Sequence, residues 1–431
     1  RESLDRIDRL ASRHRGHRGH RGHWATMGLF SFEIQPEVTF SSGANARLRH
    51  RLQSSRCLEP IQLSRLCHFS LGSLTLTATP NPELPIMREE IDLNGTLLAI
   101  DWLDAAPKDA PNVTPAGVLL LFPGIGTNSR RGFTGMTAHH LAKSFPRHKV
   151  GVAVLQGHDG LPLKSTCFPA TAYVSIGDTG RLIEHVSRQF QGLPMVVVAC
   201  SIGAAHFTHW AGSHPEKVKQ CGVVGAVLVC HGTSARPAAT AVDSSGAAPF
   251  ILEAYRDILR TNFPDLTAFQ DIPGFDPSKL SAARTLREWD EAVLPLYGFQ
   301  RHEDVLDAVD TTPQMMRALP MPTVFLGAAN DPITPSTRLL EGGVHQLVSD
   351  CAVIHCSHGS HMAWWQPVAG NPLHLEQNWA RDLMAELISI LADLPHPTTE
   401  ASEASETSPS ETSEERRVLS CFPCQAVMRR H

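Results

Sequence analysis

Short apolar runs alternate with helical stretches through the middle of the chain, and this alternation limits the fold more than any other feature. The runs 117–122, 150–155, 195–200 and 223–230 are rich in Val, Leu and Ile and lack a polar residue at every second position. Strands with this pattern are buried on both faces. Since helical stretches separate the runs, the sequence predicts a mostly parallel sheet flanked by helices. Further strands are expected within 91–102 and at 323–326 and 351–355, and helices at 134–144, 178–189, 202–211, 336–347 and 374–391.

Charge and hydropathy exclude several classes of protein. The 431 residues include 38 Lys+Arg and 43 Asp+Glu, a formal net charge of −5, so we expect no nucleic-acid partner. The longest apolar runs fall well short of the roughly 18 to 20 residues that cross a bilayer. We therefore expect no transmembrane segment, although peripheral contact with a membrane stays open. Ten scattered cysteines indicate a reduced, intracellular protein, cytoplasmic or organellar, without a disulfide framework.

Composition divides the chain into three parts. Residues 1–85 lack hydrophobic periodicity and are rich in Arg and Ser, which predicts a disordered or targeting-like arm. Residues 396–431 are predicted to be a disordered acidic tail rich in Ser, Thr and Glu, and the lone pair Cys421 and Cys424 within it is weak evidence for zinc. The folded domain is expected at 86–395. Its segment 233–319 is too long for one connection and is expected to form an inserted helical cap.

One serine lies in a sequence context typical of a nucleophile. The stretch Ala199-Cys-Ser201-Ile-Gly203 follows a predicted strand and precedes a helix of small residues. This matches the nucleophile elbow G-x-S-x-G, in which the serine occupies a sharp turn between strand and helix. Gly203 meets the need for a tiny residue, whereas Ala199 adds one methyl group. The alternative is a serine that only caps the next helix.

Two further residues follow in the order that such a serine requires. Asp331 lies in the loop after the predicted strand 323–326, and His361 follows the strand 351–355. The order Ser, acid, His is that of a hydrolase triad on an open α/β sheet. His358 competes for the role of base, but we prefer His361 because it lies at a loop-to-helix junction. A zinc site on these two histidines is the other reading, although no third ligand follows at zinc spacing.

A glycine-rich loop completes the pattern. An oxyanion hole needs two backbone N–H donors, one from the residue after the nucleophile and one from the loop after an early strand. Ile202 is the first candidate. The loop Pro123-Gly-Ile-Gly126 supplies the second, the N–H of Ile125. A phosphate-binding loop is the alternative, but the glycine spacing fits neither common phosphate motif.

Several blocks in order carry a family resemblance, and the most distinctive is Thr285-Leu-Arg-Glu-Trp-Asp290 within the expected cap. Together they cover about 91–367. The sequence resembles the α/β-hydrolase-domain family of YheT-type hydrolases, plant embryogenesis-associated proteins, yeast medium-chain ethyl-ester synthase/esterases and animal α/β-hydrolase-domain lipases. The resemblance implies the α/β-hydrolase fold, the triad Ser201, Asp331 and His361, oxyanion donors at Ile125 and Ile202, and no metal or organic cofactor. Pro123, Gln156 and Ala199 depart from the residues usual in the family, which are His, Arg and Gly.

These features together predict a serine carboxylic-ester hydrolase. The expected substrate is a small-molecule, lipid-like acyl ester such as a monoacylglycerol or a medium-chain ester, cleaved through an acyl-enzyme. Two alternatives stay open. One is an alcohol acyltransferase, or ester synthase, that uses the same triad, and the other is a catalytically silent binding protein with this fold.

Overall fold

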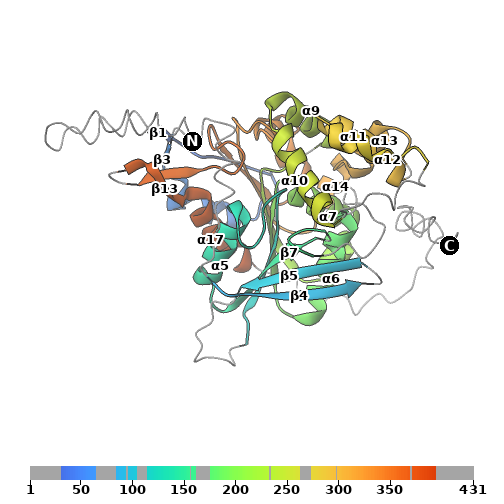
Figure 1. Ribbon diagram of the computed structural model, residues 1–431. Helices are drawn as coiled ribbons and strands as arrows, with labels where there is room; N and C mark the ends of the chain where they lie inside the picture. The colour runs from blue at the N-terminus through green and yellow to red at the C-terminus, as the bar shows by residue number, and fades with distance from the viewer. Residues whose placement is uncertain are drawn as a thin grey trace.

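A nine-stranded sheet forms the centre of the molecule (Figure 1). The computed structural model describes residues 31–64, 84–93, 96–103, 114–155, 157–161, 175–232, 234–262, 273–297, 299–368 and 371–394. The strand order is β2-β11-β10-β9-β8-β6-β7-β5-β4, and β6 to β11 run parallel. The strands span β2 Glu37–Phe40, β4 Ile86–Leu93, β5 Thr96–Leu103, β6 Gly117–Phe122, β7 His148–Val154, β8 Met195–Cys200, β9 Val223–Val229, β10 Thr323–Ala328 and β11 Cys351–Cys356.

Each central strand contributes side chains to two separate apolar layers. In β8, Val196, Val198 and Cys200 belong to one layer, and the residues that alternate with them belong to the other. The first layer lies under α5 (Gly132–Ser144) and α17 (Trp379–Ala392). The second lies under α6 (Ser175–Gln189), α7 (Ile202–Ser213), α8 (Pro215–Gln220), α15 (Thr337–Glu341) and α16 (Val344–Leu347). Burial on both faces is the physical reason for the apolar runs in the sequence.

The expectation of an arm without structure at 1–85 is wrong for residues 31–64. Strand β2 is the sheet edge and pairs antiparallel with β11, while β1 (Ser31–Ile34) pairs with β3 (Ile61–Ser64). Between them lie α3 (Ala46–Gln53) and the short 3₁₀ helix η1 (Arg56–Leu58). The strands are only four residues long, and the helix buries just Leu48 and Leu52 among basic residues. Elements this short carry almost no periodic signal.

The predicted helix 374–391 also needs correction, because its first residues are a strand. A two-stranded ribbon of β12 (Trp365–Val368) and β13 (Asn371–Asn378) precedes α17. The helix begins after Asn378, whose side chain accepts a hydrogen bond from the N–H of Ala380. An asparagine in this position is a favourable N-cap, and it sets the boundary that apolar spacing alone does not.

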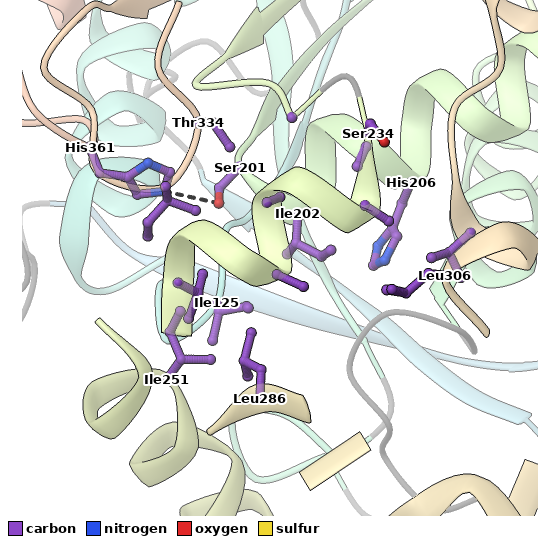
Figure 2. Close-up of a pocket in the computed structure, with 18 of the residues that line it drawn as sticks. Ile125, Ser201, Ile202, His206, Ser234, Ile251, Leu286, Leu306, Thr334 and His361 are labelled. Atoms are coloured by element: carbon purple, nitrogen blue, oxygen red, sulfur yellow. Dashed lines mark hydrogen bonds between the residues drawn. The ribbon is translucent and has the colours of Figure 1, made fainter. Parts of the chain in front are cut away.

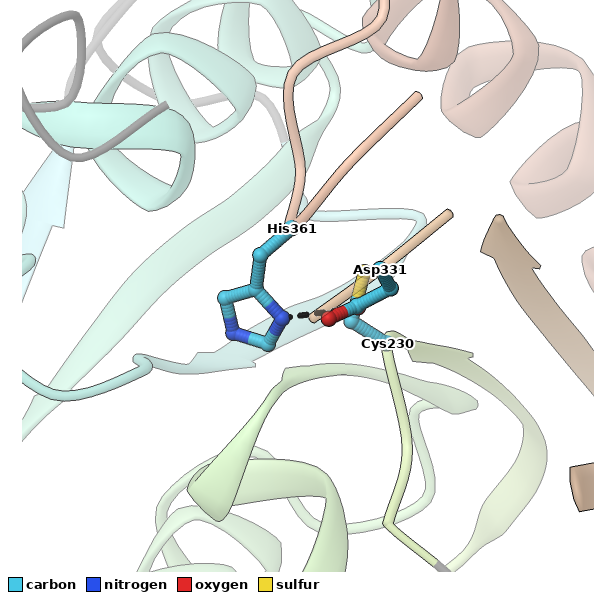
Figure 3. Close-up of side chains that lie close together, drawn as sticks. All are labelled: Cys230, Asp331 and His361. Atoms are coloured by element: carbon cyan, nitrogen blue, oxygen red, sulfur yellow. Dashed lines mark hydrogen bonds and ion pairs between the residues drawn. The ribbon is translucent and has the colours of Figure 1, made fainter. Parts of the chain in front are cut away.

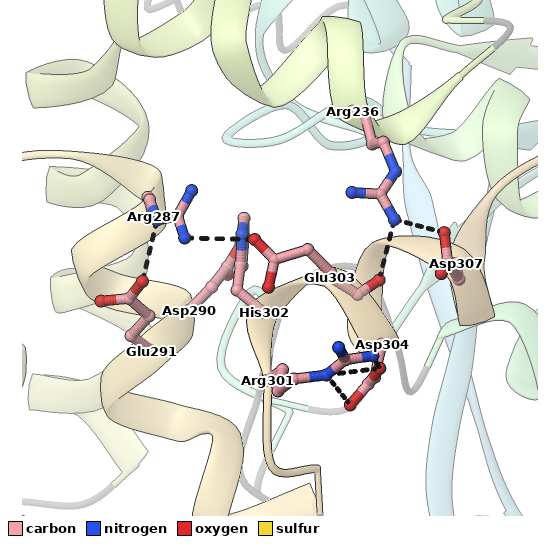
Figure 4. A network of polar contacts seen from close by, with 9 residues as sticks. All are labelled: Arg236, Arg287, Asp290, Glu291, Arg301, His302, Glu303, Asp304 and Asp307. Carbon is pink, nitrogen blue, oxygen red and sulfur yellow. Dashed lines mark hydrogen bonds and ion pairs between the residues drawn. The ribbon is translucent and has the colours of Figure 1, made fainter.

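The described part of the chain between β9 and β10 is helical, and its helices lie over one end of the sheet (Figure 1). They have their own apolar core, in which the fully buried Trp289 packs against Tyr255 with ring centroids 5.6 Å apart. Ion pairs join neighbouring helices on the outside, among them Arg236 with Asp307 (Figure 4). The helices are α9 (Ala235–Ser245), α10 (Ala248–Asn262), α11 (Pro277–Ala282), α12 (Leu286–Tyr297), α13 (His302–Val309) and α14 (Pro313–Arg317). We call α9 to α14 the cap.

Among the described residues, no helix combines the length and the apolar character that a membrane span requires. Residues 1–30 and 395–431, which include the pair Cys421 and Cys424, lie outside the described residues. Gln156 lies outside them as well.

The N-terminal segment should contribute measurably to stability. Leu48 is fully buried against the core formed by α17, so Leu48→Ala removes packing on both sides of that contact. We expect the free energy of unfolding to fall by about 2 to 5 kcal/mol in urea titrations. Gln53→Ala, an exposed change on the same helix, is the control. If both variants unfold like the wild type, the segment is not part of the cooperative core.

Candidate active site

Ser201 occupies a strained turn directly after β8. Its backbone has φ 52° and ψ −119°, in the left-handed half of conformational space that non-glycine residues rarely adopt. The Ser201 N–H donates to the carbonyl of Val229, the last residue of β9, at 2.8 Å. A Cβ on Gly203 would lie 2.7 Å from the carbonyl oxygen of Pro123, so only glycine fits there. The sharp turn that the sequence predicts is therefore present.

The two departures closest to this turn fit the structure. Ala199 is fully buried in β8, and its methyl group packs in the layer that contains Phe122 and Phe207. The residue after Pro123 is Gly124, where a Cβ would lie 3.2 Å from the Cβ of Ser201. The residue that lies against Ser201 is therefore Gly124, and this close contact does not depend on whether proline or histidine precedes it.

A continuous chain of hydrogen bonds joins Ser201, His361 and Asp331. The Nε2 atom of His361 lies 3.0 Å from Ser201 Oγ, and its Nδ1 atom lies 2.8 Å from Asp331 Oδ2 (Figures 2 and 3). A carboxylate can only accept, so Nδ1–H donates to Asp331 and Nε2 is left to accept from the serine hydroxyl. The three side chains come from the ends of β8, β10 and β11, which meet at one edge of the sheet.

The Asp331 carboxylate is buried but well supplied with donors. It accepts hydrogen bonds from the N–H groups of Ile333 and Thr334, at 2.8 and 2.9 Å, and from the Thr334 hydroxyl at 2.9 Å. Burial by itself would raise the pKa of Asp331. The electrostatic interaction with the His361 ring and the hydrogen bonds from His361, Thr334 and Ile333 outweigh burial and hold the pKa of Asp331 below its usual value. The carboxylate therefore stays ionised and fixes the ring.

The loop that carries His361 has an unusual backbone on both sides of the histidine. Ser360 and Met362 have φ values of 48° and 65°, and Gly359 has a φ of 151°. The N–H of Ser360 donates to the Asn330 side chain at 2.8 Å, which ties this loop to the one that carries Asp331. This bond therefore joins the two loops in addition to the hydrogen bond between the His361 and Asp331 side chains.

The competing histidine does not reach the serine. His358 Nδ1 pairs with the hydroxyl of its neighbour Ser357 at 3.1 Å. His355 lies in β11, and its Nδ1 pairs with Ser336 Oγ at 2.8 Å. Of the histidines in this segment, the structure brings only His361 into contact with Ser201 and Asp331.

Cys230 is a neighbour of this group that the sequence reading did not single out. Its Sγ atom and the ligand atoms of Asp331 and His361 lie within 4.8 Å of one another, and all three residues are buried (Figure 3). Burial, followed by the charge of Asp331, raises the pKa of the Cys230 thiol well above its usual value. Metal binding requires the thiolate, so this environment disfavours a metal. One signal was available: β9 lies between β8 and β10, so the residue that directly follows β9 must lie between Ser201 and Asp331.

The two predicted oxyanion donors flank the serine. Ile202 is the first residue of α7, and Ile125 lies in the loop after β6, where the Thr127 hydroxyl donates to the carbonyl of Gly124 at 2.9 Å. Among the described residues, neither Ile125 N–H nor Ile202 N–H has a hydrogen-bond acceptor. Both residues line the same cavity as Ser201 (Figure 2).

That cavity has a volume of about 170 Å³ and lies between the sheet edge and the cap. Most of its wall is aliphatic or aromatic, and Ser201 and His361 lie at one end of it (Figure 2). The apolar wall includes Val242, Ile251, Tyr255, Leu286, Leu306 and Ile333. Such a wall suits a hydrocarbon chain and offers little to a charged group.

A family model described as "Serine aminopeptidase, S33" (Hydrolase_4) matches residues 113–364, more than half of the chain. The chain belongs to this family. Together with the sheet order, the match shows the α/β-hydrolase fold and hydrolase class of this S33-family protein, and the fold prediction is confirmed. No curated protein matches the sequence.

The solved structures that are similar to this chain include the following three. α/β-Hydrolase domain-containing protein 10 from mouse is 15% identical, with 72% of this chain and 98% of that chain covered and a TM-score of 0.39. A structure from a study of two fungal esterases from Rhizomucor miehei is 15% identical, with 80% and 91% covered and a TM-score of 0.40. A bacterial membrane phospholipase A is 15% identical, with 72% and 87% covered and a TM-score of 0.41.

One buried imidazole beside the site makes stability depend on pH. His231 is 2% exposed and contacts the Phe325 ring edge-on, and neither of its ring nitrogens has a hydrogen-bond partner among the described residues. Burial lowers the pKa of His231 to about 4. The unfolded chain binds this proton below about pH 6.5, whereas the folded protein binds it only below about pH 4.

The S33-family protein should therefore lose stability as pH falls from about 6.5 to about 4, by up to about 3 kcal/mol from this residue. His231→Leu, which cannot titrate, should flatten that part of the curve. Urea unfolding at several pH values measures both slopes. An unchanged slope in the variant would assign the pH dependence to other groups.

Proposed function

We propose that this S33-family protein is a serine carboxylic-ester hydrolase that acts on lipid-like acyl esters. One observation carries the proposal: the hydrogen-bonded chain Ser201–His361–Asp331 ends in a hydroxyl at the end of an apolar cavity. The narrower resemblance adds support, because its cap block Thr285–Asp290 contributes Leu286 and Asp290 to the cavity wall. We also propose membership of that narrower group.

The mechanism follows from which atoms can donate and which can accept. Ser201 Oγ attacks the ester carbonyl while His361 Nε2 takes its proton, and the carbonyl electron pair moves to the oxygen. The N–H groups of Ile125 and Ile202 stabilise that oxyanion. His361 then protonates the leaving alkoxide, and an acyl group remains on Ser201. Water repeats the sequence and releases the acid, while Asp331 holds the ring and stabilises its charged form.

Two other activities use the same triad: transfer of the acyl group to an alcohol, and hydrolysis of an aminoacyl amide. An alcohol that replaces water would make the protein an acyltransferase with the same acyl-enzyme. The family description names an aminopeptidase, which must bind the amine of its substrate. Asp290 is a carboxylate in the cavity wall, but it pairs with His302 at 3.0 Å (Figure 4). Most of the remaining wall is apolar. This balance favours acyl esters over aminoacyl amides.

A fluorophosphonate probe tests the nucleophile. The wild type should be labelled covalently, and Ser201→Ala should not be labelled. Ser201→Ala and His361→Ala should each lower kcat on a short-chain p-nitrophenyl ester by roughly 10⁴- to 10⁶-fold, because each removes a member of one proton-transfer unit. His358→Ala, three residues away on the same loop, is the matched control and should keep wild-type turnover. No labelling of the folded wild type would favour the silent binding protein.

The cavity wall should set the preferred acyl length. Leu286 lines the cavity on the cap side, opposite the serine end (Figure 2). Leu286→Trp should shift the optimum in kcat/KM toward shorter p-nitrophenyl esters, by about tenfold between neighbouring members of a graded series. Phe250→Trp, an exposed change on α10, should leave the profile unaltered. Faster turnover of an aminoacyl p-nitroanilide than of every ester would overturn the ester proposal.

Product analysis separates hydrolysis from transfer. With ethanol added, a hydrolase still yields mainly free acid, whereas an acyltransferase yields the ethyl ester. Mass spectrometry of the products of one ester substrate, with and without ethanol, distinguishes the two.

A further inference from the structure

An ion pair with a buried carboxylate lies beside the loop that carries Ile125. Asp101 in β5 is 1% exposed, and Arg88 lies opposite it in the antiparallel pair β4–β5. Arg88 donates from Nε to Oδ1 at 2.7 Å and from Nη2 to Oδ2 at 3.0 Å. A guanidinium that bonds both carboxylate oxygens fixes the orientation of the carboxylate.

The carboxylate also holds the loop itself. The Ser129 hydroxyl donates to Asp101 Oδ2, and the carbonyl of Ser129 pairs with His139 Nε2 at 3.1 Å. A Cβ on Gly135, at the start of α5, would lie 2.9 Å from the carbonyl oxygen of Asn128. The far end of the 123–129 loop is therefore held between β5 and α5.

A second connection leads to the turn after β7. Arg88 Nη1 donates to the carbonyl of Asp159 at 2.7 Å, and the Asn128 side chain donates to the Asp159 carboxylate. Asp159 has a φ of 51°, so its backbone is strained. The Asn128 side-chain oxygen accepts from the N–H groups of Arg130 and Arg131 at 2.8 and 3.0 Å. The ion pair, the loop and the turn thus form one hydrogen-bonded unit.

The length of the loop explains why this unit matters. Only three residues separate Ile125 from Ser129. One of them is Thr127, whose hydroxyl donates to Gly124 O and pairs with Thr134 Oγ1, so the middle of the loop is held both to its own start and to α5. A shift at Ser129 is therefore transmitted to Ile125. Oxyanion stabilisation depends on donors fixed in advance, and a misplacement of about 1 Å costs on the order of 10²-fold in rate.

We propose that Asp101 is a positioning residue for the 123–129 loop, which we call the oxyanion loop. Through Ser129, Asp101 fixes the Ile125 N–H at the place where the ester oxyanion forms. The inference rests on the proposed function, since it presupposes that Ser201 attacks a carbonyl beside this loop. Asp101 is no partner of Ser201 and acts through the Ser129 hydroxyl and the loop backbone. Removing its charge should weaken binding of the tetrahedral state and leave binding of an intact ketone or ester largely unchanged.

A pair of ketone inhibitors separates these two kinds of binding. With an alkyl trifluoromethyl ketone, Ser201 Oγ forms a bond to the carbonyl carbon, the carbonyl electron pair moves to oxygen, and His361 takes the serine proton. The matched alkyl methyl ketone binds largely without this addition. The ratio of their inhibition constants therefore reports on the oxyanion hole, and general loosening of the fold does not change it in the same way.

Three variants give a graded series. Asp101→Asn removes the charge, and Ser129→Ala removes only the bond between the carboxylate and the loop. Glu89→Gln is the matched control, because Glu89 is the next residue of β4. Its carboxylate pairs with Trp102 Nε1 at 2.7 Å and with His185 Nε2 at 2.9 Å, and neither partner belongs to the 123–129 loop. Urea unfolding of all three shows how far each is destabilised. Ser129→Ala keeps the test decisive if Asp101→Asn does not fold.

We expect Asp101→Asn to weaken trifluoromethyl ketone binding by about 10²-fold and Ser129→Ala by about tenfold, with methyl ketone binding changed less than about threefold. Glu89→Gln should keep the wild-type ratio. An unchanged ratio in a folded Ser129→Ala and Asp101→Asn, with a normal wild type, overturns this inference and leaves the proposed function standing. A wild type that binds both ketones equally, with no adduct on Ser201, overturns both.

Discussion

The site depends on an approach of two backbone segments that leaves no room for a side chain. Strand β6 and its loop lie so close to the turn after β8 that a Cβ at Gly203 would meet the carbonyl oxygens of Phe122 and Pro123 at 2.8 and 2.7 Å. Gly124 brings the same loop against Ser201 from the other side. This contact places the serine hydroxyl and the two flanking N–H groups in one small volume, so the nucleophile and the oxyanion donors are set by the same packing.

Most of the described non-glycine residues with strained, positive-φ backbone lie near that contact. The described non-glycine residues with positive φ are Asp159, Ser201, Cys230, Ser360 and Met362. Four of them flank or form the hydrogen-bonded chain from serine to carboxylate, and the fifth belongs to the unit behind the oxyanion loop. Each such residue costs on the order of 1 to 3 kcal/mol, which the surrounding structure must offset. The paired strands and the buried carboxylates, Asp331 with its backbone donors and Asp101 with Arg88, provide that support.

The fold, and the proximity of Ser201, Asp331 and His361, could be predicted from the sequence because both follow from the buried parallel strands. The strands Gly117–Phe122 and Met195–Cys200 have the predicted bounds, because burial on both faces leaves a strong apolar signal. Ser201, Asp331 and His361 meet because parallel strands end at one sheet edge, and their catalytic roles stay predictions. Segment 31–64 was missed because its four-residue strands depend on partners more than 20 residues away. The Arg88–Asp101 pair leaves no local pattern either: it depends on cross-strand register and on a loop serine.

The choice between His358 and His361 shows where sequence reasoning must stop. Both histidines follow β11 within a few residues, and both have glycine or serine neighbours. What separates them is the direction of the chain, set by the left-handed residues on either side of His361 and by the hydrogen bond from Ser360 N–H to Asn330. That bond ties the histidine loop to the aspartate loop, so the backbone decides which ring meets the carboxylate. A backbone conformation of this kind is maintained by tertiary contacts, and no pattern of residue types over a few positions specifies it.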